Sequence, residues 1–330
     1  MNMTILRQHS YPPQFLDIIN SIKGLSKLDW KDVDSICEML ACSDAADSYV
    51  KSACYMLFTG RRGLWLYRAN KWQSFVCLHP NINDRLLIFP PVGELDFAEY
   101  AAFVKKLRKS GAKLDFCRFE NLDIIAPLGA VGVKLVPVIE QKLDWMYPCV
   151  ILSTERVVAL IGAGFENVRG RLRQIDQKSV VVRDIDIKRD KEEITNFVGR
   201  WAKNKDAQYI ENYLSPYICL LDLMESGLVT LYGRLIYYNN KLSGFSIYER
   251  PASDLNIANA FSFIGDHDTK GMSEYVVWDM CQKLLSDKVS KVNLGGSENF
   301  GLNRFKNKFD PIKLVKIYTL NEVKNPANDL

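Results

Sequence analysis

The chain has 330 residues, of which 48% are hydrophobic and 25% are charged. This composition indicates a folded globular protein of about two domains and excludes a largely disordered chain. The net charge of +4 and the pI near 8.5 permit a nucleic acid or an anionic cofactor as a partner but do not require one.

The eight cysteines contain no C-x-x-C pair and lie mostly inside apolar runs. They are predicted to be reduced core residues of a cytosolic protein, without a metal site. No apolar run reaches the ~18 residues that a membrane-spanning helix needs, and the first residues lack the apolar core of a signal peptide. We therefore expect a cytoplasmic protein without an integral membrane segment.

The first 120 residues predict helix, antiparallel strands, helix and strand in that order. A helix capped by Asp29 uses Trp30, Val33, Ile36, Cys37 and Leu40 as its apolar face. Residues 63–70 and 72–80 form two β-rich runs around the hairpin signal Asn70-Lys71, and 85–93 is a third run. Asp96 begins a second helix that ends at Ser110-Gly111, and 114–120 is the next strand.

The second half repeats this order without repeating any sequence. A helix is predicted from Ser153 or Thr154 to about Asp176, followed by the strand 179–186 and helices at 191–203 and 210–225. Strands at 228–238 and 244–250 are joined through Asn239-Asn240-Lys241, and 259–265 is a third strand. A helix at 273–285 then precedes the strand 291–294.

These patterns predict an α/β protein with mixed sheets covered by helices and with two domains of similar architecture. The predicted domains are residues 1–150 and 151–320, with a tail at 321–330. On the helix that opens the second domain, arginines lie opposite the apolar stripe: Arg156, Arg169, Arg171 and Arg173. This cluster is either an ordinary solvated face or a docking surface for phosphates.

The segment 291–308, KVNLGGSENFGLNRFKNK, joins an apolar strand to a glycine-rich turn and then to a basic helix. Backbone N–H groups of such a turn, together with positive side chains, suit an anionic ligand. The simpler interpretation is an ordinary strand-to-helix turn, in which Asn293 bonds its own backbone.

The run NLGGSENFGLNRFKNKFDP at 293–311, with Tyr318 after it, resembles the C-terminal segment of tandem-GNAT proteins. These are the Fem-type peptidyltransferases and the soluble DUF2156-like part of phosphatidylglycerol lysyltransferases. Residues 143–176 resemble their strand and long helix between the domains, and 64–80 with 85–93 resemble their first-domain strands. The resemblance covers most of the chain loosely.

This resemblance implies two tandem GNAT-like domains and a transferase whose donor is an aminoacyl-tRNA. It puts Lys306 at the donor site, where an ammonium stabilises the oxyanion formed on the reacting ester. The other predicted donor-binding residues are Asn293, Gly295, Gly296, Arg304, Phe305, Lys308, Lys270 and Gly271. Predicted contacts with tRNA phosphates are Arg169, Arg171, Arg173 and Lys313.

Acyl-CoA is the alternative donor. GNAT enzymes that use it carry a Q/R-x-x-G-x-G/A loop after the third strand, but this chain reads GDHDTKGMSEY in the second half and PPVGELDF in the first. The missing motif disfavours acyl-CoA, although Lys270, Gly271 and the start of the next helix still suit a phosphate.

The general base is expected among polar residues at strand ends of the second half, with Glu249, Asp266, His267 and Asp268 as the candidates. The sequence lacks the nucleophile motif G-x-S-x-G, the metalloprotease motif H-E-x-x-H and a nucleotide-binding phosphate loop. Direct attack without a covalent enzyme intermediate is therefore expected, with no metal and no tightly bound cofactor.

Three hypotheses follow. The first is an aminoacyltransferase acting on an amine or hydroxyl of a small molecule, a peptide or a lipid headgroup. The second is an acyl-CoA-dependent N-acyltransferase on the same fold, and the third is a non-catalytic GNAT-like binding protein.

Overall fold

The computed structural model describes residues 13–28, 32–138, 146–203, 210–251 and 253–323. The chain divides into two compact units, Met1–Met146 with Lys316–Leu330 and Tyr147–Val315. The first division lies four residues before the predicted boundary at 150. Residues 316–320, which the predicted boundaries place in the second domain, belong to the first unit, where a strand at Tyr318–Glu322 joins the sheet. Of the predicted tail, residues 324–330 lie outside the described part.

The first unit is built on a sheet with the order β1-β2-β3-β4-β6-β15-β7, in which β5 also pairs with β3. Strands β4 and β6 are parallel neighbours. The predicted hairpin at Asn70-Lys71 is confirmed, since β2 and β3 pair on either side of it. The strands are β1 Leu25–Lys27, β2 Leu64–Arg68, β3 Trp72–Leu78, β4 Arg85–Ile88, β5 Val92–Gly93, β6 Lys113–Phe119, β7 Leu135–Pro137 and β15 Tyr318–Glu322.

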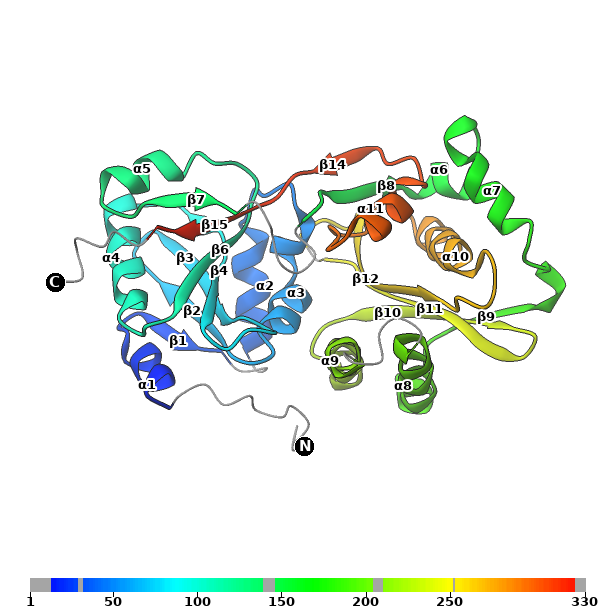
Figure 1. Ribbon diagram of the computed structural model, residues 1–330, viewed down its shortest axis with the longest axis horizontal. Helices are drawn as coiled ribbons and strands as arrows, with labels where there is room; N and C mark the ends of the chain where they lie inside the picture. Colours follow the sequence, from blue (N-terminus) through cyan, green and yellow to red (C-terminus); the bar gives the residue numbers. More distant parts are fainter. Residues whose placement is uncertain (1–12, 29–31, 139–145, 204–209, 252, 324–330) are drawn as a thin grey trace. The chain divides into compact units, whose positions relative to one another are not determined.

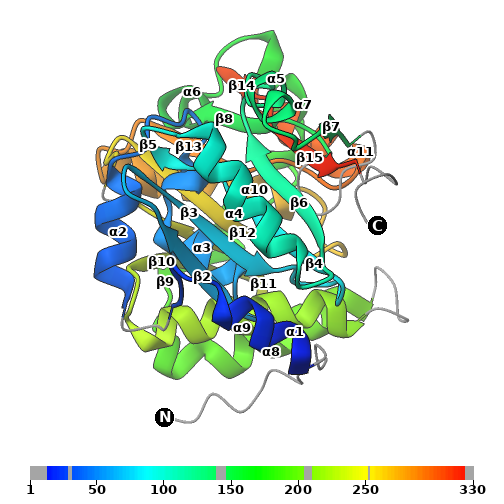
Figure 2. The same cartoon turned by 90° about the vertical axis from the view of Figure 1, so that its left-hand side faces the viewer.

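Helices cover both faces of this sheet, with α4 on one face and α2 and α3 on the other (Figures 1 and 2). Asp96 begins α4 as predicted, because its carboxylate accepts hydrogen bonds from the N–H groups of Ala98 and Glu99 at 2.9 and 3.0 Å. Asp29 and Trp30 lie outside the described residues. The helices are α1 Pro13–Ser21, α2 Val33–Ala41, α3 Ala53–Thr59, α4 Phe97–Arg108 and α5 Ile125–Ala130, with a 3-10 turn η2 at Ser48–Lys51.

The second unit has its own sheet, with the order β14-β8-β13-β12-β11-β10-β9. Strands β12 and β13 are parallel, and the other neighbouring pairs are antiparallel. The predicted hairpin is confirmed: Asn239 and Asn240 both have positive φ, as a type I′ turn requires. The strands are β8 Cys149–Ser153, β9 Val180–Asp184, β10 Leu231–Tyr238, β11 Lys241–Glu249, β12 Ile257–Gly265, β13 Lys291–Asn293 and β14 Lys313–Val315.

Helix α10 packs on one face of this second sheet, and α8 and α9 lie on the other (Figure 1). None of the helices within the described ranges is long and apolar enough to cross a membrane. The helices are α6 Thr154–Ala159, α7 Glu166–Leu172, α8 Ile187–Lys203, α9 Ile210–Ser226, α10 Met272–Ser286 and α11 Phe300–Asn307, with 3-10 turns η4 Ala163–Phe165 and η5 Gln177–Ser179.

The single long helix predicted from residue 153 to about 176 is wrong. Ser153 caps α6 as expected, but the helix ends at Leu160, which has a left-handed backbone, and Gly162 follows with φ 101°. The helical spacing predicted an apolar stripe of Val157, Leu160, Ile161, Phe165, Val168 and Leu172, but Ile161 is 81% exposed. The chain resumes as α7, whose Val168 and Leu172 are buried as the spacing predicted.

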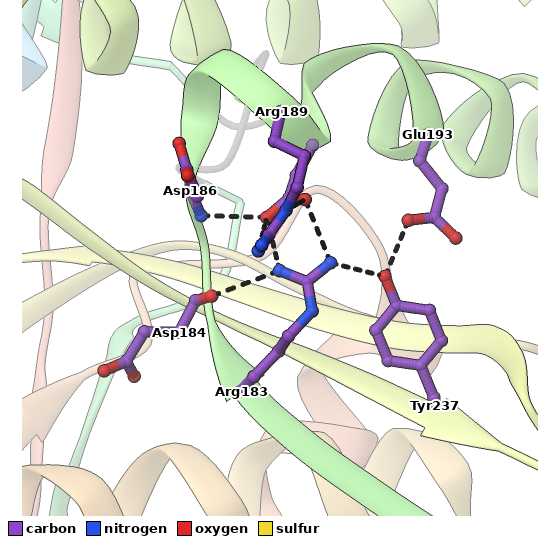
Figure 3. Close-up of polar contacts among 7 residues, drawn as sticks. Arg183, Asp184, Asp186, Arg189, Glu193 and Tyr237 are labelled. Atoms are coloured by element: carbon purple, nitrogen blue, oxygen red, sulfur yellow. Dashed lines mark hydrogen bonds and ion pairs between the residues drawn. The ribbon is translucent and has the colours of Figure 1, made fainter.

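A buried carboxylate fixes the start of α8 to the edge of the second sheet (Figure 3). The Asp190 carboxylate is 1% exposed and accepts hydrogen bonds from both terminal nitrogens of Arg183 on β9. It also accepts a hydrogen bond from Arg189 Nε at 2.8 Å. Arg183 donates to the Tyr237 hydroxyl at 2.7 Å, which in turn donates to Glu193 at 2.6 Å. Burial alone would raise the pKa of Asp190, but these hydrogen bonds outweigh it and hold the pKa well below its usual range.

Replacing Asp190 by asparagine is expected to lower the free energy of unfolding at pH 7 by about 2 kcal/mol, because charge-assisted bonds to both arginines are lost. The pKa of Asp190 is lower in the folded protein than in the unfolded chain, where it is near 3.9. The stability that its charge contributes is therefore present above pH 3.9 and is progressively lost as the pH falls below that value. The difference in the free energy of unfolding between the unmodified protein and Asp190→Asn, measured by urea unfolding, should therefore be about 1 kcal/mol smaller at pH 3 than at pH 5. The exposed pair Lys71–Glu94 gives the matched control, Glu94→Gln, and a pH-independent gap for Asp190→Asn would contradict this account.

Candidate active site

The glycine-rich turn after β13 is held together by two buried polar side chains. Asn293 accepts a hydrogen bond from Gly295 N at 2.9 Å, so the alternative predicted for it, bonding its own turn, is what the structure shows. Lys306 of α11 is only 3% exposed, and its Nζ donates to the carbonyls of Leu294 at 2.7 Å, Gly295 at 3.3 Å and Gly296. The lysine ammonium therefore neutralises the carbonyl side of this turn.

A cavity of about 520 Å³ lies beside this turn, at the end of β12. Strands β12 and β13 pair only from Ile257 to Asn259, after which β13 ends and β12 continues to Gly265. The cavity opens past this point, between the end of β12, the start of α10 and the start of α11. Its lining residues are Arg171, Trp201, Phe263, Ile264, Gly265, Asp266, His267, Thr269, Lys270, Gly271, Ser273, Glu274, Glu298, Asn299, Gly301, Leu302, Phe305 and Lys308.

Two glycines allow the N-terminus of α10 to form one wall of the cavity. A Cβ on Gly265 would lie 2.5 Å from the backbone nitrogen of Ser273, so only glycine lets β12 approach the helix this closely. Gly271 caps α10 with φ 86°, and a Cβ there would lie 2.3 Å from the carbonyl oxygen of Arg171. The helix therefore presents its positive dipole end to the cavity, an arrangement that suits an anion.

Smaller hollows continue the cavity on both sides. One of about 400 Å³ shares Arg171, Phe305 and Lys308 with the cavity and adds Arg304. The other, about 280 Å³, shares Trp201 and His267, whose rings stack with centroids 6.0 Å apart. Both hollows carry cations: Arg171, Arg304 and Lys308 line the first, and Arg200, Lys203 and Lys241 line the second beside the Trp201 and His267 rings.

The lining of the main cavity also contains an ion pair that the sequence did not predict. Lys308 Nζ lies 3.0 Å from the carboxylate of Glu274, which is 5% exposed and belongs to the first turn of α10. Glu274 therefore holds the Lys308 ammonium beside the first turn of α10, in the lining of the cavity.

The structure brings together about half of the predicted site residues. His267, Lys270, Gly271, Phe305 and Lys308 line the main cavity, while Arg304 and Asp268 line the adjoining hollows. Of the predicted phosphate contacts, only Arg171 reaches the cavity.

The remaining predicted residues lie elsewhere. Arg169 donates to the carbonyls of Leu160 at 2.6 Å and Gly162 at 2.7 Å, and so stabilises the break between α6 and α7. Arg173 is exposed at the end of α7, and Lys313 is exposed on the edge strand β14. Glu249 is buried where β11 pairs with β12 and is not a lining residue of the cavity. Asn293, Gly295, Gly296 and Lys306 form the buried support beside the cavity, and a direct role for any of them in the reaction stays a prediction.

In the first unit the corresponding place is filled by protein side chains. Past the last parallel pair, Ile88 and Phe116, the end of β6 carries Arg118, which is fully buried against Asp47 with N and O 2.6 Å apart. Arg118 also donates to the hydroxyl of Tyr55 at 3.0 Å. The ion pair thus lies past the last parallel residue pair of β4 and β6, as the cavity of the second unit lies past the last parallel pair of β12 and β13.

Each unit contains antiparallel strands, a crossing helix and a parallel strand, so the protein has a tandem GNAT fold. A search against protein-family models found no match, and none was found among curated protein sequences. Among solved structures, a conserved protein of unknown function from Bacteroides thetaiotaomicron is similar, with a TM-score of 0.70 and 14% identity over 91% of this chain and 99% of that one.

Two further similar structures carry functional descriptions. One is the C-terminal DUF2156 domain of an Agrobacterium fabrum protein described as a lysylphosphatidylglycerol synthetase, with a TM-score of 0.58 and 14% identity over 90% and 92% of the two chains. The other is a tandem GNAT protein from the clavulanic acid biosynthesis pathway, with a TM-score of 0.57 and 12% identity over 91% and 98%. The tandem GNAT fold expected from the sequence is thus confirmed.

Proposed function

We propose that the second unit is an acyltransferase that moves an aminoacyl group from aminoacyl-tRNA to an amine or hydroxyl of a small molecule, a peptide or a lipid headgroup. The observation that carries this proposal is the cavity past the end of β13, which joins the α10 N-terminus to a row of cationic side chains. The fold shared with a domain described as belonging to a lysylphosphatidylglycerol synthetase supports it.

The proposed reaction is direct transfer. The lone pair of the acceptor attacks the ester carbonyl, the new C–N or C–O bond forms, and the ester bond to the ribose breaks. His267 is exposed in the cavity wall, where it takes the acceptor proton and passes that proton to the ribose oxygen, which leaves as a hydroxyl. Backbone N–H groups at the start of α10 stabilise the oxyanion, and the buried ammonium of Lys306 keeps the neighbouring turn in place.

The donor is proposed from charge. Arg304 and Arg171 line the hollow next to the cavity, and Lys308 is shared by both. Such a row suits successive phosphates of an RNA strand, where phosphate contacts supply most of the affinity.

Two arginines on one short segment test the donor assignment. Both side chains are exposed, but Arg171 lines the cavity and Arg173, two residues further along, does not. We expect Arg171→Ala to weaken binding of charged tRNA by about tenfold and to lower the salt dependence by about one phosphate contact, while Arg173→Ala changes affinity less than about twofold. Filter binding with charged tRNA at several salt concentrations measures both. Equal effects of the two variants, or no binding by the unmodified protein, would reject the tRNA donor.

Acyl-CoA is the second candidate donor, and the α10 N-terminus beside Lys270 favours it, because a pyrophosphate suits that position. Calorimetry with acetyl-CoA should then detect binding that Lys270→Ala weakens. If neither donor is bound or consumed, the third hypothesis, a non-catalytic binding protein, is favoured.

A further inference from the structure

The first unit contains a separate cavity of about 570 Å³, at the start of the parallel strands β4 and β6. Arg85 and Lys113, the first residues of these strands, are register partners there, whereas the active-site cavity of the second unit lies at strand ends. The end of α4, the segment before β7 and the end of β15 complete its walls. Its position in the fold therefore differs from that of the proposed donor site.

Positive charge dominates this cavity. Its two carboxylates are neutralised by arginines: Arg85 lies 2.6 Å from Asp115, and Arg108 binds Glu322 through two nitrogens. The lysines of the lining then set the potential, and they are Lys105, Lys109, Lys113 and Lys134.

Helix capping explains only part of this charge. Lys105 and Lys109 lie at the C-terminal end of α4, where cations stabilise the helix dipole. Lys113 and Lys134 come from other segments, so the helix does not account for them. The ion pair of Lys113 with Asp84 is more than half exposed on both sides and is worth little. Gathering like charges around a concave surface costs free energy, which a bound anion recovers.

We propose that this cavity binds a small molecule with two or more phosphate groups. Lysines act as compact charges for phosphate, whereas the two arginines are already engaged by carboxylates. Among the described residues, no aromatic side chain lines this cavity. A nucleobase would therefore have no ring to stack on. A volume of about 570 Å³ accommodates a compact phosphorylated metabolite.

The test measures the binding of inorganic pyrophosphate to the full-length protein by calorimetry at low salt. Because the α10 N-terminus of the second unit also suits a pyrophosphate, binding is measured in the Lys270→Ala background, where we expect one binding site and at least about tenfold weaker binding when Lys109→Gln/Lys134→Gln is added. The matched control is Lys23→Gln/Lys27→Gln, which removes the same charge from exposed lysines of the same unit outside the cavity and should change affinity less than about twofold.

Three results would overturn the proposal: equal weakening in both double variants, unchanged affinity in the cavity variant, or several weak sites. A cavity variant that loses tRNA binding, in a protein that binds no pyrophosphate, would also overturn it and identify a polynucleotide contact instead. Circular dichroism confirms that the variants are folded, which is expected because all four lysines are exposed.

Discussion

Replacing Lys306 by methionine is expected to lower the free energy of unfolding by about 3 kcal/mol. Methionine fills a similar volume but leaves three buried carbonyls, those of Leu294, Gly295 and Gly296, without their cationic donor. Relief from burying an ammonium offsets part of the loss, since Lys306 is only 3% exposed. Urea unfolding measures the change, and amide exchange of Gly295 and Gly296 should become faster.

Lys291 provides the control, because it is an exposed lysine on β13 immediately before the same turn. Lys291→Met should change stability by less than about 0.5 kcal/mol. The outcome also separates two roles for Lys306. If Lys306→Met keeps its stability and amide protection but loses transfer, the lysine acts at the reacting ester, as the sequence resemblance implied. Loss of stability and protection together would establish that it positions the turn.

The sequence predicted the parts of the fold that local patterns specify. Asp96 correctly predicted the start of α4, which it caps, and Asn239 and Asn240 correctly predicted the two-residue hairpin turn between β10 and β11. Helix α3 was missed because six of its seven residues are buried, so it shows no polar face and no helical period. The break at Gly162 was missed for the opposite reason: apolar spacing continued through it, although the backbone did not. Strand β15 pairs with β6 across some 200 residues of chain, which no local pattern reveals.

The site was predictable where it follows a strand directly. His267, Lys270 and Gly271 come just after β12, and polar residues at a strand end are expected to be exposed. Trp201 belongs to a distant helix and was not predicted, whereas Arg171 was predicted as a phosphate contact from the resemblance; that both line the same cavity follows only from the folded structure. The burial of Lys306 was equally hidden, because its partners are backbone carbonyls, and these carry no signal in the sequence.

Breaking the buried ion pair of the first unit is expected to have the largest effect on stability. Arg118→Met should lower the free energy of unfolding by about 4 kcal/mol, because Asp47 is left charged and fully buried. The guanidinium also lies over the rings of Tyr49 and Tyr55, at 5.1 and 4.6 Å from their centroids, and these contacts are lost as well. Lys71→Met, at the exposed pair with Glu94, should cost less than about 0.5 kcal/mol.

A second variant tests whether an unpaired charge causes this loss. Asp47→Asn combined with Arg118→Met removes both charges, so it should be less destabilising than the sum of the two single variants by at least about 1 kcal/mol. Additive effects would mean that the two side chains act independently, as packing alone would require. Neither single variant should alter binding of the donor, since every residue of the proposed donor site belongs to the second unit.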